Sequence, residues 1–266
     1  MSFLTAYRKL LVGQTDNHPV WRYNPKLGGR MLADDLAVPM PRLFGYTEKP
    51  SGVWPYVHAA HAIHELAVIK PNHGSTSRAV LPLTRDLRGL KQDAVADEKG
   101  WTLWLEEQAR ATNQRIAGPW LVEEGMMHPD GTRHADDLRV YVFGGRAQFV
   151  QRDANDPQHP TNRRAITWAF WDPYGNRIAA KKLAMVSRQE APQDAPRPKD
   201  LARILYWAER IASKVETSFL RVDFLEGRER VVFGELTPHP GPLTNQKVHI
   251  SPDFDEELGR HLPVSR

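Results

Sequence analysis

Apolar residues recur at the helical period in the most regular segment of the chain. Between positions 200 and 215 they lie at a spacing that places them on one face of a helix. These residues are Leu201, Ile204, Leu205, Ala208, Ile211, Ala212 and Val215. The pattern predicts an amphipathic helix over 200–215 that buries this face. A stripe of Trp101, Leu105 and Ala109 predicts a second helix over 97–115.

Short apolar runs between turn residues predict strands in the rest of the chain. They cover 66–70, 79–83, 119–124, 138–143, 147–151, 218–225 and 230–236, with two shorter strands within 165–179. The first sixty residues are rich in proline and glycine, so we expect only short regular structure there, and a loop over 186–199. Because strands joined by short hairpins alternate with helices, the pattern favours an α+β fold with antiparallel sheets.

The composition narrows the class of protein. The chain has 266 residues, of which 41% are hydrophobic and 26% charged, as in an ordinary globular protein. It contains no cysteine, which excludes disulfides, thiolate nucleophiles and cysteine-ligated metal sites. No apolar run is long enough to cross a bilayer, and the first residues favour a short amphipathic helix over a secretory signal. We therefore expect a cytoplasmic protein without membrane insertion.

The positive charge is concentrated in one stretch. The formal net charge is +4, and residues 146–182 carry seven basic and three acidic side chains, a surplus of four. So small a net charge does not indicate nucleic-acid binding. The stretch is either a solvated basic face or a site for an anionic ligand.

One lysine occupies a position suited to binding phosphate, and an arginine and an aspartate share a strand face. Lys70 ends the predicted strand 66–70 and precedes the polar turn 71–75, where an ammonium group and backbone N–H groups can surround a phosphate. In the strand 218–225, alternation places Arg221 and Asp223 together on the face opposite the core.

Two carboxylates lie on the last pair of predicted strands. Glu235 is expected on the same face as Val231 and Phe233, an apolar setting in which a carboxylate needs a partner. The turn at 226–229 can bring Asp223 and Glu235 together, and two carboxylates beside a hydroxyl suit Mg²⁺. A structural ion pair with Arg221 is the alternative, and the spacing alone does not separate the two.

Six motifs resemble those of a known enzyme family. The segments AVIKPNHGS, DLRVYVFGGRAQFVQ, FWDPYGNRI, RVDF, FGELT and SPDFDEELGR occur in the order seen in TupA-like ATP-grasp proteins. The resemblance extends from about Pro25 to Leu262 and implies the ATP-grasp fold, with two α+β lobes whose antiparallel sheets enclose the nucleotide. It implies a reduced N-terminal lobe at 1–60, a small lobe at 61–124 and a large lobe at 125–266.

The resemblance also implies roles for individual residues. Lys70 and Arg221 would be catalytic, and Asp223, Glu235 and Thr237 would bind Mg²⁺. ATP would be bound by Lys70, the loop residues Asn72, His73, Gly74 and Ser75, the hinge residues Glu123, Glu124 and Met126, and by Asp137, Arg139 and Arg30, with Lys26 near Arg30 and Val122 as a further ring contact.

The implied activity is an ATP-dependent carboxylate–amine ligase that acts through an acyl phosphate. Its partners would be ATP, Mg²⁺, a small acidic carboxylate and an amine acceptor, in the biosynthesis of cell-surface polysaccharides or peptide conjugates. The alternative is an ATP-binding regulatory or accessory protein without ligase chemistry. A polysaccharide-processing transferase is a third interpretation, but no sequence feature supports a sugar-nucleotide site.

Overall fold

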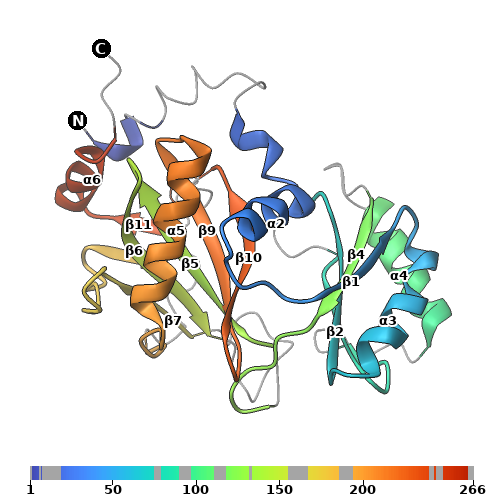
Figure 1. Cartoon of the computed structure of the whole chain (residues 1–266). Coiled ribbons are helices and arrows are strands. Elements are labelled where there is room, and N and C mark those ends of the chain that lie inside the picture. The colour runs from blue at the N-terminus through green and yellow to red at the C-terminus, as the bar shows by residue number, and fades with distance from the viewer. Residues whose placement is uncertain are drawn as a thin grey trace.

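The computed structural model of the protein describes residues 2–5, 7, 19–74, 79–89, 97–110, 118–131, 134–154, 167–185, 194–239, 243 and 248–262. Within these residues the strands form a four-stranded, a five-stranded and a two-stranded sheet. The two larger sheets lie side by side with helix α2 (Lys26–Asp35) between them (Figure 1). The expected α+β fold with antiparallel sheets is confirmed.

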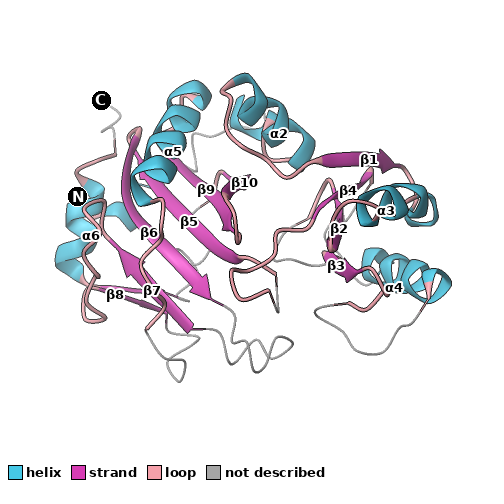
Figure 2. Ribbon diagram, turned by 60° about the horizontal axis from the view of Figure 1, so that its bottom comes forward, coloured by secondary structure: helices cyan, strands magenta, loops and turns pink. Residues whose placement is uncertain are grey.

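The four-stranded sheet forms the smaller lobe. Its strands are ordered β1 (Leu43–Thr47), β4 (Trp120–Glu124), β2 (Leu66–Pro71) and β3 (Leu81–Thr84), and all pair antiparallel. Helices α3 (Trp54–His61) and α4 (Glu98–Arg110) cover its outer face (Figure 2). The buried stripe of α4, Trp101 and Leu105, packs there against residues of β2, β3 and β4. The opposite face of the sheet is turned toward α2.

The five-stranded sheet forms the larger lobe. Its order is β10 (Val231–Thr237), β9 (Phe219–Glu226), β5 (Asp136–Phe143), β6 (Arg146–Ala154) and β7 (Thr167–Trp171). Helix α5 (Leu201–Val215) covers one face and buries its predicted apolar stripe against β5 and β9 (Figure 1). Gly144 and Gly145 have φ angles of 55° and 79°, so the glycine pair makes the expected tight hairpin between β5 and β6.

The other face of this sheet is divided into an aromatic half and a polar half. The aromatic half holds Tyr141, Phe143, Phe149 and Phe219, which pack with helix α6 (Pro252–Gly259) and the small sheet of β8 (Leu183–Met185) and β11 (Val248–Ile250). The polar half lies at the other end of the same strands. The division follows from strand alternation, because residues two apart on β5 and β9 share a face.

The described part of the first sixty residues contains more regular structure than the sequence predicts. Besides α2, β1 and α3, they contain the 3₁₀ turns η1 (Pro19–Arg22) and η2 (Pro50–Gly52). Since β1 and α3 share the sheet and core of the smaller lobe, this unit starts before the predicted boundary at residue 61.

Two further predictions differ in detail. The second strand expected within 165–179 is reduced to a single bridge between Trp171 and Arg177. The helix expected over 97–115 is described as far as Arg110, and the described part of the expected loop 186–199 contains no helix or strand.

Candidate active site between the lobes

A β-bulge brings two carboxylates face to face on β9 and β10. Asp223 pairs with Glu235 across the strands, and the register shifts between Phe233 and Glu235, so Gly234 is the extra residue. A Cβ at Gly234 would lie 3.1 Å from the Asp223 carbonyl oxygen, which favours glycine here. The expectation that Glu235 shares a face with Phe233 is therefore wrong, because the bulge turns Glu235 to the polar face.

Arg221 holds one of these carboxylates. Its Nε and Nη2 atoms donate to the two oxygens of Asp223 at 2.7 and 2.6 Å, and Nη2 also donates to Thr237 Oγ1 at 2.9 Å. Glu235 lies 4.0 Å from the same Nη2. Burial raises the pKa of Asp223 above its ordinary value, and the nearby Glu235 raises it further, although Arg221 opposes both effects. The predicted convergence of Arg221, Asp223, Glu235 and Thr237 is present.

Arg139 on β5 connects two more carboxylates to this group. It pairs with Asp153 on β6, with Asp137 at 3.5 Å and with Asp223 at 3.9 Å. Burial alone would lower the pKa of Arg139, but these carboxylates raise it well above its ordinary value. Asp153 is buried and was not predicted.

A chain of hydrogen bonds connects Tyr141 through Gln151 to Asp153. The Gln151 amide donates to Asp153 at 2.8 Å and accepts from the Tyr141 hydroxyl at 2.9 Å. The signal for this network was visible in the sequence, since three consecutive polar residues, Gln151, Arg152 and Asp153, lie near the end of a strand that is otherwise largely apolar and buried.

The smaller lobe contributes a second charged group around Glu123. This carboxylate is 2% exposed and lies 2.5 Å from Lys70 Nζ and 2.6 Å from Arg30 Nη1. Arg30 also donates to the carbonyl oxygen of Pro41 at 2.8 Å. The side chain of Glu123 thus holds two of the predicted ATP-binding cations, a role that the sequence analysis did not assign to it.

Lys26 joins the two charged groups. Its Nζ lies 3.7 Å from Glu235 and donates to the Gly74 carbonyl oxygen at 3.2 Å. The side chain is 7% exposed, and this burial lowers the pKa of Lys26 below its ordinary value. Gly74 ends the described part of the polar turn after β2, which also contains Asn72 and His73, whereas Ser75 lies outside the described residues.

One family accounts for this combination of fold and charged residues. The family described as TupA-like ATPgrasp matches residues 47–263 of the chain. This chain belongs to that family. The match includes strands of both larger sheets and every predicted site residue except Lys26 and Arg30, which precede it on α2.

Solved structures give the same fold. The ATP-grasp ligase PsnB complexed with a minimal precursor matches with a TM-score of 0.51 and 16% identity, over 96% of this chain and 68% of PsnB. D-alanyl-alanine synthetase A from Vibrio cholerae matches with a TM-score of 0.53 and 14% identity, over 91% and 62%. D-alanine–D-alanine ligase from Bacillus anthracis matches with 0.51 and 13%, over 92% and 65%. No match was found among curated protein sequences.

The predicted ATP-grasp hinge begins at the end of β4. Glu124 accepts from Arg230 at 2.6 Å and from the Arg42 backbone N–H at 3.0 Å, which joins the hinge to the β9–β10 turn and to the start of β1. Met126 is buried in a small cluster with Val232 of β10. Val122, predicted as a ring contact, is fully buried in the core of the smaller lobe.

The basic residues of 146–182 do not form one face in the described part of the chain. Arg146 pairs with the partly exposed Glu209 of α5, Arg177 lies over the ring of Trp171, and Lys182 over that of Phe254. Arg152 is buried and pairs with Asp136 and Glu226, which are nearly inaccessible. Arg163 and Arg164 lie outside the described residues.

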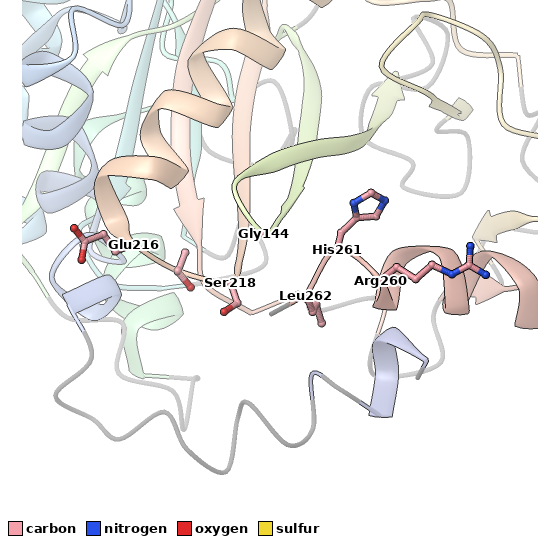
Figure 3. Close-up of a pocket in the computed structure, with 7 residues that line it drawn as sticks. Gly144, Glu216, Ser218, Arg260, His261 and Leu262 are labelled. Carbon is pink, nitrogen blue, oxygen red and sulfur yellow. The ribbon is translucent and has the colours of Figure 1, made fainter. Parts of the chain in front are cut away.

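A pocket lies away from the charged groups, at the opposite end of β5. It is lined by the β5–β6 turn, the end of α5 and the end of α6, and Figure 3 shows Glu216 and Arg260 extending to opposite sides of it. Because its polar side chains do not converge, it is a weaker candidate than the site between the lobes.

Two features are absent from the described residues, a metal-binding group larger than a pair and a membrane-spanning helix. They contain no group of three or more His, Asp or Glu side chains arranged to hold a metal ion, so Asp223 and Glu235 form a pair. None of the described helices is both long enough and apolar enough to span a membrane.

Proposed function

We propose that this TupA-like ATP-grasp protein is an ATP-dependent ligase that joins a small acidic carboxylate to an amine through an acyl phosphate. The observation that carries the proposal is the Asp223–Glu235 pair, placed in register by the bulge and surrounded by cations from β5, β9 and α2. Asp223 is buried beside a second carboxylate, and two carboxylates this close favour a bound cation.

The residues present fit a bound Mg²⁺ ion. Magnesium prefers oxygen ligands and keeps several positions for water and phosphate, so two carboxylates and one hydroxyl suffice. Asp223, Glu235 and Thr237 are the residues that would hold it. The ion supplies charge neutralisation for the transferred phosphoryl group.

The lysine and arginine side chains would bind the phosphates of ATP and stabilise the negative charge that develops during the reaction. Lys70 and Arg30 would exchange part of their pairing with Glu123 for the phosphates, beneath the loop of residues 72–75. Adenine would lie at the hinge formed by Glu123, Glu124 and Met126, and the ribose beside Asp137, with Arg139 nearby. Phosphoryl transfer depends mainly on this positioning and neutralisation.

The reaction would proceed in two steps. A carboxylate oxygen of the acid attacks the γ-phosphorus of ATP, the bond to the β-phosphate oxygen breaks, and ADP leaves. The amine then attacks the acyl carbon, and a tetrahedral oxyanion forms and expels inorganic phosphate, while the amine loses a proton to solvent. Arg221, with a pKa raised by its carboxylate partner despite burial, stays cationic and would stabilise the oxyanion.

The substrate and biological setting are the finer parts of the proposal. An acidic substrate suits a site rich in arginine and lysine. We place the reaction in the cytoplasm, in the biosynthesis of cell-surface polysaccharides or peptide conjugates, the role that the resemblance to TupA-like proteins implies.

A substrate screen tests the proposal. ADP release is measured with Mg²⁺ and ATP against panels of acids and amines, and mass spectrometry identifies the product. We expect one acid–amine pair to give stoichiometric ADP and an amide. ATP binding without any amide product would favour the regulatory or accessory alternative.

A further inference from the structure

The phosphate loop is bonded to helix α2 through Asn72. Asn72 is 7% exposed, and each of its four polar atoms has a partner in the protein. Its backbone N–H donates to Pro119 at 2.8 Å, and its carbonyl oxygen accepts from the backbone N–H of Lys26 at 3.1 Å. Its side-chain Oδ1 accepts from the backbone N–H of Leu27 at 2.9 Å, and Nδ2 lies 3.2 Å from His73 Nε2.

These bonds supply a cap that the local sequence of α2 does not provide. The first N–H groups of a helix have no partner within the helix and are usually capped by the residue just before it. In α2 that residue is Pro25, which makes no side-chain capping bond. The carbonyl and the side chain of Asn72 serve instead, although Asn72 lies 45 positions after Leu27 in the chain.

Helix α2 is also bonded to both groups of charged residues. Lys26 donates to the Gly74 carbonyl oxygen in the loop and lies 3.7 Å from Glu235, while Arg30 pairs with Glu123. On its other side α2 packs on β10, where a Cβ at Gly29 would lie 3.3 Å from the Phe233 ring. A displacement of the loop from α2 would therefore change its position relative to Glu235.

We infer that Asn72 is a positioning residue, which fixes the phosphate loop to α2 and through it to the carboxylates of β9 and β10. On this inference the Asn72 side chain acts by capping α2 and does not contact the phosphates. It rests on the proposed function in one respect, that the loop covers the phosphates of ATP.

Two substitutions separate positioning from direct contact. Asn72→Ala removes the capping oxygen, whereas Asn72→Asp keeps it and adds a negative charge at a helix N-terminus, where a carboxylate is favourable. If the side chain contacts phosphate, the same negative charge repels ATP. The two hypotheses thus predict opposite orders for the two variants.

The experiment measures Mg-ATP affinity by calorimetry and hydrogen exchange at the Leu27 amide. We expect Asn72→Ala to weaken affinity about fivefold, the value of one helix cap, and to reduce Leu27 protection by a similar factor. Asn72→Asp should retain most of the protection and weaken affinity by no more than about twofold. Greater weakening by Asn72→Asp than by Asn72→Ala overturns the inference, as does unchanged Leu27 protection in Asn72→Ala.

A cap elsewhere gives the matched control. Ser251 caps α6 by accepting a hydrogen bond from the Phe254 backbone N–H. This cap lies away from the candidate site between the lobes. Ser251→Ala should lower thermal stability as a lost cap does and leave Mg-ATP affinity unchanged. Should Asn72→Ala not fold, the affinity and Leu27 exchange of Asn72→Asp decide alone. If the wild-type protein does not bind Mg-ATP, the proposed function fails. The hydrogen exchange at Leu27 still tests whether Asn72 caps α2.

Discussion

Removing the Glu123 carboxylate should destabilise the protein strongly. Glu123 is 2% exposed, and its two partners, Lys70 and Arg30, are 11% and 12% exposed. Glu123→Gln keeps the shape of the side chain but leaves two buried cations without their anion. Breaking a buried ion pair in this way costs about 3–5 kcal/mol.

This loss is large enough to measure directly. A loss of 1 kcal/mol lowers the melting temperature by about 2–4 °C in a protein of this size, so the expected decrease is about 6–20 °C. Calorimetry without nucleotide measures it. As a matched control, Glu106→Gln removes a carboxylate from an exposed pair with Arg110 and should cost about 0.5 kcal/mol or less.

A double-mutant cycle then tests the reasoning. Lys70→Met in the wild-type background removes a partner of Glu123, but in the Glu123→Gln background it removes an unpaired cation. We expect a coupling energy of about 2–3 kcal/mol between the two substitutions. Additive effects, or a loss below about 1 kcal/mol for Glu123→Gln, would refute the assignment of Glu123 as the anion that both cations need.

Three more predictions concern other parts of the molecule. Arg152→Met removes the buried cation that pairs with Asp136 and Glu226 and should cost about 3–5 kcal/mol, measured by chemical denaturation, without weakening Mg-ATP binding in the folded protein. Gly28→Ala would place a Cβ 2.0 Å from a backbone carbonyl oxygen of η1, so we expect a loss of about 2–3 kcal/mol, and wild-type stability would contradict the packing of α2. Reversing the charge of Arg163 and Arg164 should raise the KM of the acidic substrate. Unchanged kinetics would indicate that the basic stretch 146–182 is a solvated face.

The parts of the fold with strong local patterns could be predicted from the sequence. Helix α5 was found because its apolar residues keep the helical period throughout. Helix α2 was missed because Pro25 and the pair Gly28–Gly29 read as a turn. Its cap comes from Asn72 and its glycines allow close approach to η1 and Phe233, so tertiary contacts that no local pattern contains hold it in place.

The sequence analysis named some of the residues that lie together in the candidate site, but it missed Asp153 and most of the connections between them. Strand alternation placed Arg221 and Asp223 together, as the structure has them. Alternation failed for Glu235, because one extra residue at a bulge reverses the face of everything that follows. The side-chain role of Glu123 could not be predicted either, since its partners come from β2 and α2, and only the folded chain brings them together.

Turnover by the carboxylate variants tests the central claim most directly. ADP release is measured for the wild type, Asp223→Asn and Glu235→Gln, with circular dichroism to verify that each is folded. The account predicts Mg²⁺-dependent release by the wild type and none by either variant. Wild-type rates in both folded variants would contradict it.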